Sequence, residues 1–196
     1  MDVATGIDAG TMRVSLARRA HAGDSAALNE LLAELGPIVV RTARLIVGSG
    51  SASAEDAAQD ALLDISRDIG KLRDTSAVKT WALRIATRRA LKVARRERLL
   101  RLRHTEMAED IEERVPGAPG QTAALKAAFD RLPLRLRATA VLRLQAGLSE
   151  EETAEVLGCA VGTVKSNLHD ARARLTAALT DAGYAPTVKP PEEAHQ

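Results

Sequence analysis

Two short helices are indicated by "LSEEETAEVLGCAVGTVKSNLHDARARL", residues 148–175, the stretch that decides the fold of the C-terminal part of the chain. Ser149 and Glu152 have the spacing of a capping box, and Gly158 is placed to end the first helix. In the second helix, apolar residues recur at positions 161, 164, 168, 171 and 175. This periodicity predicts an amphipathic helix whose apolar face is held by the first helix.

The same periodicity leaves polar and basic side chains on the outer face of the second helix: Thr163, Lys165, Ser166, Asn167, His169 and Arg172. Short polar and basic groups on such a helix are typical of a helix-turn-helix that reads the major groove, where an Asn amide can pair with adenine. A helical hairpin with a merely solvated face would show the same spacing. Periodicity alone leaves both interpretations open.

Composition bounds the fold class. The 196-residue chain is 45% hydrophobic and 2% aromatic, which favours an all-α protein. No apolar run approaches the roughly 20 residues of a membrane span, and the N-terminus lacks a signal-peptide pattern, so we expect a cytoplasmic protein without membrane insertion. The single Cys159 and four scattered histidines predict neither a disulfide nor a metal site.

The formal net charge of +2 hides a segregation of charge along the chain. Basic residues dominate positions 84–103, and acidic residues follow at 106–113 before a Pro/Gly run. This change predicts a domain boundary and a flexible linker. The predicted order is a disordered N-terminus (1–11), a first helical domain (12–103), an acidic Pro/Gly linker (104–120), a second helical domain (121–182) and a disordered tail (183–196).

Helix signals divide each domain further. Asp24 is placed to cap a helix through residue 35, Pro37 to start a separate helix, and Ser53 with Asp56 to form a capping box. We expect helices at about 12–22, 24–35, 38–47, 53–69, 78–102, 121–131, 133–145, 150–157 and 161–179. Ala160 offers no side-chain cap to the last of these, and Cys159 is expected to be a buried packing residue.

Three motifs carry a resemblance to a known family. Residues 132–175, "LPLRLRATAVLRLQAGLSEEETAEVLGCAVGTVKSNLHDARARL", resemble region four of the bacterial extracytoplasmic-function (ECF) sigma factors of the sigma-70 family. "SAEDAAQDALLDI" (53–65) and "KTWALRIATRRALKVARRER" (79–98) are similar to region two and its following helix. The two domains would then be a region 2 bundle and a region 4 helix-turn-helix, joined by the linker.

The resemblance implies a subunit that binds RNA polymerase core through its clamp and directs promoter-specific initiation, commonly under the control of an anti-sigma factor. Asp56, Asp60 and Asp64 are spaced to share one helix face, which suits a basic partner, although a solvated acidic face would look the same. The residues implied in core polymerase binding are Glu55, Asp56, Gln59, Asp60 and Asp64.

The basic helix and the loop before it would hold the downstream promoter element, with its cations neutralising phosphates. The residues expected there are Lys71, Arg73, Lys79, Arg84, Arg88, Arg89, Lys92, Arg95 and Arg96. Relatives usually carry aromatic residues flanking this loop, where this chain has Leu72 and Val78. Trp81 is expected in the core. Base capture would then depend on backbone, polar and Arg groups.

No catalytic motif is present, so we expect neither an enzyme nor a cofactor or small-molecule substrate. Two alternatives to a sigma factor remain open. One is a stand-alone helix-turn-helix transcriptional regulator, which polymerase binding would exclude. The other is a sigma-like decoy that binds polymerase or a regulator without opening DNA, which promoter-specific transcription would exclude.

Overall fold

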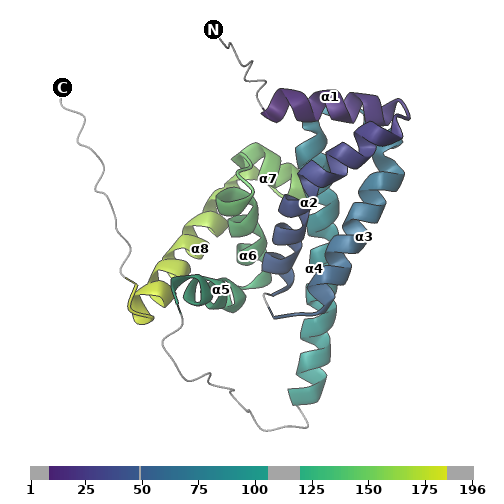
Figure 1. Ribbon diagram of the computed structural model, residues 1–196. Helices are drawn as coiled ribbons and strands as arrows, with labels where there is room; N and C mark the ends of the chain where they lie inside the picture. Colours follow the sequence, from purple (N-terminus) through teal and green to yellow (C-terminus); the bar gives the residue numbers. More distant parts are fainter. Residues whose placement is uncertain (1–8, 49, 106–119, 185–196) are drawn as a thin grey trace, which may run out of the picture.

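The computed structural model describes residues 9–48, 50–105 and 120–184, and all regular structure in these residues is helical (Figure 1). The expected all-α fold is therefore confirmed. The N-terminal half contains α1 (Ala9–His21), α2 (Ser25–Val47), α3 (Ser53–Asp68), the 3-10 turns η1 (Ile69–Lys71) and η2 (Thr75–Ala77), and α4 (Val78–Thr105). The C-terminal half contains α5 (Gln121–Arg131), α6 (Leu134–Ala140), the π-helical turn η3 (Val141–Gln145), α7 (Glu150–Leu157) and α8 (Val161–Asp181).

Helices α1 to α4 pack around one apolar core. The regular spacing of large side chains along α2 buries Leu31, Leu35 and Val39, which are at most 1% exposed, against residues such as Ile65 of α3. The predicted cap of α2 is present, because the Asp24 carboxylate accepts a hydrogen bond of 3.0 Å from the backbone N–H of Ala27. Local capping and long-range burial thus act on the same helix.

The predicted break at Pro37 was wrong, since α2 runs unbroken through it. A proline inside a helix removes one backbone hydrogen bond and costs about 3 kcal/mol. Here Pro37 and Ala33, whose carbonyl loses its helical partner, lie on the exposed side of α2. Leu35 and Val39 on the opposite side are buried. Packing on both sides of the proline therefore outweighs its local preference.

The predicted Ser53–Asp56 capping box was also wrong. Ala52 already has helical backbone angles (φ −60°, ψ −35°) and is the N-cap of α3, without a side-chain cap bond. Ser53 consequently lies within the first turn instead of preceding it. The nearby Ser51 hydroxyl donates a hydrogen bond of 2.5 Å to Glu97 of α4, so the polar side chain at this end of α3 contacts another helix.

The expected boundaries shift in other places. Helix α4 extends to Thr105, which places the first residues of the predicted linker in a helix. Helix α1 begins at Ala9, earlier than expected, and α6 changes to a π-helical turn at Val141, where regular helix was expected. Residues 106–119 of the predicted linker and most of the predicted disordered ends lie outside the described residues.

The two halves share buried surface. In Figure 1, α5 to α8 lie along one side of α2 and α4, and the C-terminal end of α4 projects beyond the other helices. Leu83 of α4 is fully buried in a cluster with Leu142, Leu148 and Val156 of the C-terminal half. None of the described helices has the length and apolar character needed to cross a membrane.

Candidate nucleic-acid interface

The predicted capping box and turn shape the helix-turn-helix as expected. The Ser149 hydroxyl accepts a hydrogen bond of 3.0 Å from the Glu152 N–H, and the Ser149 N–H donates to the Glu152 carboxylate at 2.7 Å. Gly158 ends α7 in the left-handed conformation (φ 64°), which glycine adopts at low cost. Both ends of the short helix are therefore fixed by local sequence, and α8 starts in a defined direction.

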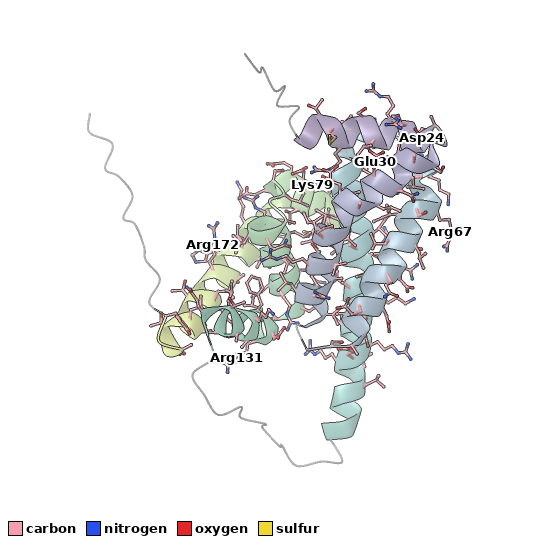
Figure 2. The ribbon with its side chains drawn as sticks, viewed as in Figure 1. Asp24, Glu30, Arg67, Lys79, Arg131 and Arg172 are labelled. Atoms are coloured by element: carbon pink, nitrogen blue, oxygen red, sulfur yellow. The ribbon has the colours of Figure 1, made fainter. Side chains whose placement is uncertain are left out.

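Helix α8 presents a polar face to solvent. Val164, Leu168, Ala171 and Leu175 are buried against the neighbouring helices, as the periodicity predicts. Five of the six residues expected on the outer face are exposed: Thr163, Lys165, Ser166, His169 and Arg172. Arg172 projects from α8 on the side away from α2 and α4 (Figure 2). The exposed face has the residue types and accessibility that major-groove binding needs.

Asn167 is the exception on α8. Its side chain is half-buried, and its amide nitrogen lies 3.5 Å from the Thr139 hydroxyl of α6. Thr139 is fully buried and donates a hydrogen bond of 3.0 Å to the Arg135 carbonyl. Asn167 thus faces α6, which differs from the expected outward position. Periodicity alone did not show this because Asn167 lies at the border between the two faces.

Two other expectations concern the turn before α8. Ala160 is the N-cap and makes no side-chain hydrogen bond, as predicted. Cys159 is half-buried, whereas a buried packing residue was expected. The exposed Glu151 lies in the first turn of α7, where its own backbone N–H and then the Ser149 hydroxyl lower the pKa of its carboxyl. Lys165 of α8 also lowers this pKa and lies 3.6 Å from Glu150, so the first turn of α7 places negative charge beside the basic face of α8.

Helix α4 divides its cations into exposed and paired groups. Arg88, Lys92, Arg95 and Arg96 are exposed, and their spacing forms a basic stripe. Arg84 is ion-paired with Glu155 of α7, and Arg89 is ion-paired with Asp60 and Asp64 of α3. The sequence shows a run of like cations, but only the structure separates those available to phosphates from those that already have carboxylate partners.

The loop before α4 is compact. Leu72 and Val78, at the positions where aromatic residues are usual, are 5% and 1% exposed. The Asp74 carboxylate accepts hydrogen bonds from the Ser76 hydroxyl and N–H, which lower the pKa of Asp74. Trp81 is half-buried against the core of α1 to α4, as expected. In the described conformation, Leu72 and Val78 offer no surface on which an unpaired base could stack.

The remaining cations expected at the promoter lie around this loop. Lys71 is ion-paired with Asp68 at 2.6 Å, although its side chain stays 76% exposed. Arg73 is exposed, and Lys79 is half-buried in the first turn of α4. Figure 2 shows Lys79 near the end of α4 that approaches α1 and α7. These cations thus lie at or before the start of α4, on the N-terminal side of the basic stripe.

Helix α3 has a mixed outer face. Asp56, Gln59 and Asp60 are exposed, whereas Glu55 and Asp64 are half-buried and ion-paired. The Glu55 carboxylate lies 2.5 Å from Arg44 of α2 and raises the pKa of that guanidinium. The five acidic and amide residues expected at the polymerase interface therefore do not form one uniform solvated surface.

Leu63, which was not among the residues predicted from the sequence, lies on the same face of α3. Its side chain is 60% exposed, a high value for a large apolar residue. Its spacing of three positions from Asp60 and seven from Asp56 could have placed it on that face. The face consequently combines carboxylates with an apolar centre. Among the described residues, no cluster of His, Cys, Asp and Glu could hold a metal ion.

Comparison with known families matches both halves of the chain. The family "Sigma-70 region 2" matches residues 31–99, and "Sigma-70, region 4" matches residues 122–175. The first match covers most of α2, all of α3 and most of α4, and the second covers the helix-turn-helix. The expected exposed faces of α3, α4 and α8 therefore all lie within matched segments.

Relatives agree with this assignment. The ECF RNA polymerase sigma factor SigM of Mycobacterium tuberculosis is 37% identical over 159 residues, which are 81% of this chain and 80% of SigM. The ECF RNA polymerase sigma factor EcfG of Rhodopseudomonas palustris is 34% identical over 138 residues, which are 67% of this chain and 74% of EcfG.

Solved structures show the same fold. CnrH, in complex with the cytosolic domain of CnrY, has a TM-score of 0.65 at 23% identity, with 87% of this chain and 98% of CnrH covered. The sigma factor RpoE, in complex with the anti-sigma factor NepR from Bartonella quintana, has a TM-score of 0.63 at 26% identity, with 78% and 96% covered. This chain therefore belongs to the sigma-70 family, in its group of ECF RNA polymerase sigma factors.

Proposed function

We propose that this chain is an ECF sigma factor that binds RNA polymerase core and directs promoter-specific initiation of transcription. The observation that carries the proposal is the presence, in one chain, of an open reading face on α8 and an exposed basic stripe on α4. One surface supplies base readout and the other neutralises phosphates. The sigma factor family is not an enzyme family, and we expect the protein to act in the cytoplasm, where RNA polymerase and promoter DNA are found.

The two DNA surfaces have different tasks. On α8, Thr163 and Ser166 can donate or accept hydrogen bonds at base edges, and Arg172 is placed for phosphates or guanines. Lys165 lies 3.6 Å from Glu150 but remains 64% exposed, so it can still reach DNA. On α4, the exposed cations add a salt-dependent term that fixes position without reading sequence. Promoter choice accordingly depends on α8 more than on the α4 stripe.

Polymerase binding is assigned to the outer face of α3. Exposed carboxylates at Asp56 and Asp60 attract a basic partner, and the exposed Leu63 between them and Arg67 supplies apolar contact area. Interfaces commonly combine such an apolar centre with a polar rim. Asp64 is only 17% exposed and is held by Arg89, so its contribution is indirect.

An anti-sigma factor is the proposed regulator. RpoE, a structural neighbour, was solved in complex with the anti-sigma factor NepR. In this chain a groove of about 1060 Å³ lies between α2, α5, η3 and α8. Leu125 and Leu144 line it and are 41% and 45% exposed, and Arg41 and Lys126 stand at its walls. These features suit an amphipathic helix with acidic residues beside its apolar face.

Transcription in vitro tests the function. Purified bacterial core polymerase, this protein and a pool of genomic promoter fragments are incubated, and transcript starts are sequenced. Specific starts that share two spaced elements are expected. Core binding without specific transcript starts would favour the decoy. The buried Leu72 and Val78, which offer no surface for base stacking, would be consistent with that outcome. Absence of core binding would leave a stand-alone DNA-binding regulator as the better account.

A further inference from the structure

Arg89 lies in the basic segment of α4, but its side chain is directed to α3. Its Nε donates a hydrogen bond of 2.6 Å to Asp64 Oδ2, and one terminal nitrogen lies 3.5 Å from Asp60 Oδ2. A second terminal nitrogen is ion-paired with Asp64. One guanidinium therefore joins two carboxylates that lie one helical turn apart.

This bridge matters because like charges four positions apart on a helix repel each other. Asp64 is 17% exposed, so water screens it less than a surface carboxylate. Arg67 also reaches Asp64, at 3.4 Å, but its own side chain is 70% exposed. Among the side chains that the structure describes, Arg89 is the only one that is ion-paired with both Asp60 and Asp64.

Asp60 is held on one side and open on the other. Its side chain is 59% exposed although one oxygen lies near Arg89, so the carboxylate can still accept hydrogen bonds from outside. A planar guanidinium with several fixed N–H groups restrains its acceptors more than a mobile ammonium group does. Arg89 thus limits the positions that the Asp60 carboxylate adopts beside the exposed Leu63.

The neighbouring cation, Arg88, behaves differently. It is exposed, and no ion pair of Arg88 is found among those of the described side chains. Because successive helical residues are separated by about 100° around the axis, Arg88 points away from the direction of Arg89. Arg88 belongs to the basic stripe with Lys92 and Arg95, and Arg89 does not.

We propose that Arg89 is a positioning residue for polymerase binding: anchored by Asp64, it orients Asp60 on the outer face of α3, and it makes no contact with promoter phosphates. This inference rests on the proposed sigma function. The position of Arg89 in the basic run suggests the promoter-binding surface of α4, but the inference assigns it to the polymerase-binding surface of α3. It also connects the polymerase-binding helix to the promoter-binding helix through one side chain.

The direction in which Arg89→Gln changes the affinity for core polymerase distinguishes a positioning role of Arg89 from an effect of net charge alone. Arg89→Gln removes a positive charge from beside two carboxylates and makes the face of α3 more acidic. If net charge alone controlled association with a basic partner, the variant would bind core polymerase as well as wild type or more tightly. If Arg89 positions Asp60, the variant binds more weakly despite its more favourable charge.

The experiment measures affinity and dissociation rate for purified bacterial core polymerase, with wild type, Arg89→Gln, Arg89→Lys and Arg88→Gln. We expect Arg89→Gln to bind on the order of fivefold more weakly, mainly through faster dissociation, since a fixed charge pair at an interface acts on that rate. Arg89→Lys should recover part of the loss, and Arg88→Gln should bind as wild type. Thermal unfolding establishes that each variant is folded.

A double substitution separates positioning from a general structural effect. In an Asp60→Asn background, Arg89→Gln should cause no further loss of core affinity, since the carboxylate that it orients is absent. Promoter binding by the holoenzyme is then measured against salt. Arg88→Gln should reduce the slope by about one unit, and Arg89→Gln should leave it unchanged.

Each outcome has a defined meaning. If wild type does not bind core polymerase, the proposed function fails, and this inference fails with it. If wild type binds but Arg89→Gln binds equally well or more tightly, only the Arg89 inference is overturned. It is also overturned if the loss persists in the Asp60→Asn background, or if Arg89→Gln lowers the salt slope as Arg88→Gln does.

Discussion

The Thr80 hydroxyl, in the first turn of α4, donates a hydrogen bond of 2.8 Å to Glu152 in the capping box of α7. The other oxygen of the same carboxylate accepts a hydrogen bond from the Ser149 N–H. Thr80 is 5% exposed, so its hydroxyl has little access to water. One carboxylate therefore completes a local helix cap and joins the two halves of the protein.

This dual role predicts unequal costs for two substitutions in the cap. Ser149→Ala should lower the free energy of unfolding by about 1 kcal/mol, the usual cost of losing an N-cap. Glu152→Ala should cost about 1 kcal/mol more, because it also leaves the Thr80 hydroxyl buried without its partner. Urea unfolding measures both. Equal losses would show that the Thr80 contact contributes nothing to stability.

Arg137 is predicted to be a major stabilising side chain between the halves. Only 13% exposed, it donates hydrogen bonds to the carbonyls of Ile46 and Val47 at 3.2 and 3.4 Å, at the end of α2. Arg137→Ala should lower the free energy of unfolding by about 2–4 kcal/mol, because it removes a largely buried guanidinium together with the hydrogen bonds that it donates to these carbonyls. Arg135 is exposed and provides the control. Arg135→Ala should change the free energy of unfolding by no more than about 0.5 kcal/mol. Similar losses for both variants would contradict this assignment.

Asn167 should affect promoter binding without changing base preference. Its amide faces Thr139, so Asn167→Ala is expected to weaken binding of all promoter sequences to a similar degree. Ser166→Ala, on the exposed face, should instead alter preference at one base position, by about 1–3 kcal/mol of discrimination. Selection of promoters from a randomised pool measures the binding strength and the base preference of both variants. A new base preference in the Asn167 variant would show that this side chain reads DNA.

Glu155 is expected to reduce the DNA affinity of α4 through its ion pair with Arg84. Glu155→Gln should release Arg84, raise the affinity of the protein for DNA and steepen its salt dependence by about one unit. Glu30→Gln, on an exposed part of α2, makes the same change in net charge. Fluorescence anisotropy over a salt series compares the two. Equal gains in DNA affinity for Glu155→Gln and Glu30→Gln would mean that net charge, and not release of Arg84, controls the affinity.

The cap of α2 should contribute stability that depends on pH. The Ala27 N–H, and then Arg19, hold the pKa of Asp24 below its ordinary value of 3.8. The stability due to the ionised carboxylate is therefore present above that ordinary value and lost as the pH falls through the lower pKa of the folded state. The difference in unfolding free energy between wild type and Asp24→Ala should be largest at neutral pH and shrink below pH 3.8.

Urea unfolding at several pH values measures this difference. Asp24→Asn is the control, because its amide oxygen still accepts the cap hydrogen bond but carries no charge that titrates. Its stability relative to Asp24→Ala should change little over the same pH range. A difference between wild type and Asp24→Ala that is independent of pH would show that the charge of Asp24 does not contribute.

The sequence by itself determined the helix-turn-helix and the all-helical fold. The capping box at Ser149, the glycine at 158 and the apolar spacing of α8 act over a few residues, so local patterns were sufficient to predict them. The exposed positions on α8 followed from the same periodicity, except at Asn167 on the border of the face. The family motifs also predicted a region 2 domain followed by a region 4 domain, the order in which the two families match the chain.

Only the tertiary structure decided which charged side chains are available to partners. Arg84, Arg88 and Arg89 look alike in the sequence, but Glu155 is brought to the first and Asp64 to the third by helices distant in the chain. Pro37 shows the same effect on the backbone, since burial of Leu35 and Val39 keeps α2 continuous where local preference favours a break. Packing energies depend on contacts between segments far apart in sequence, which no local pattern contains.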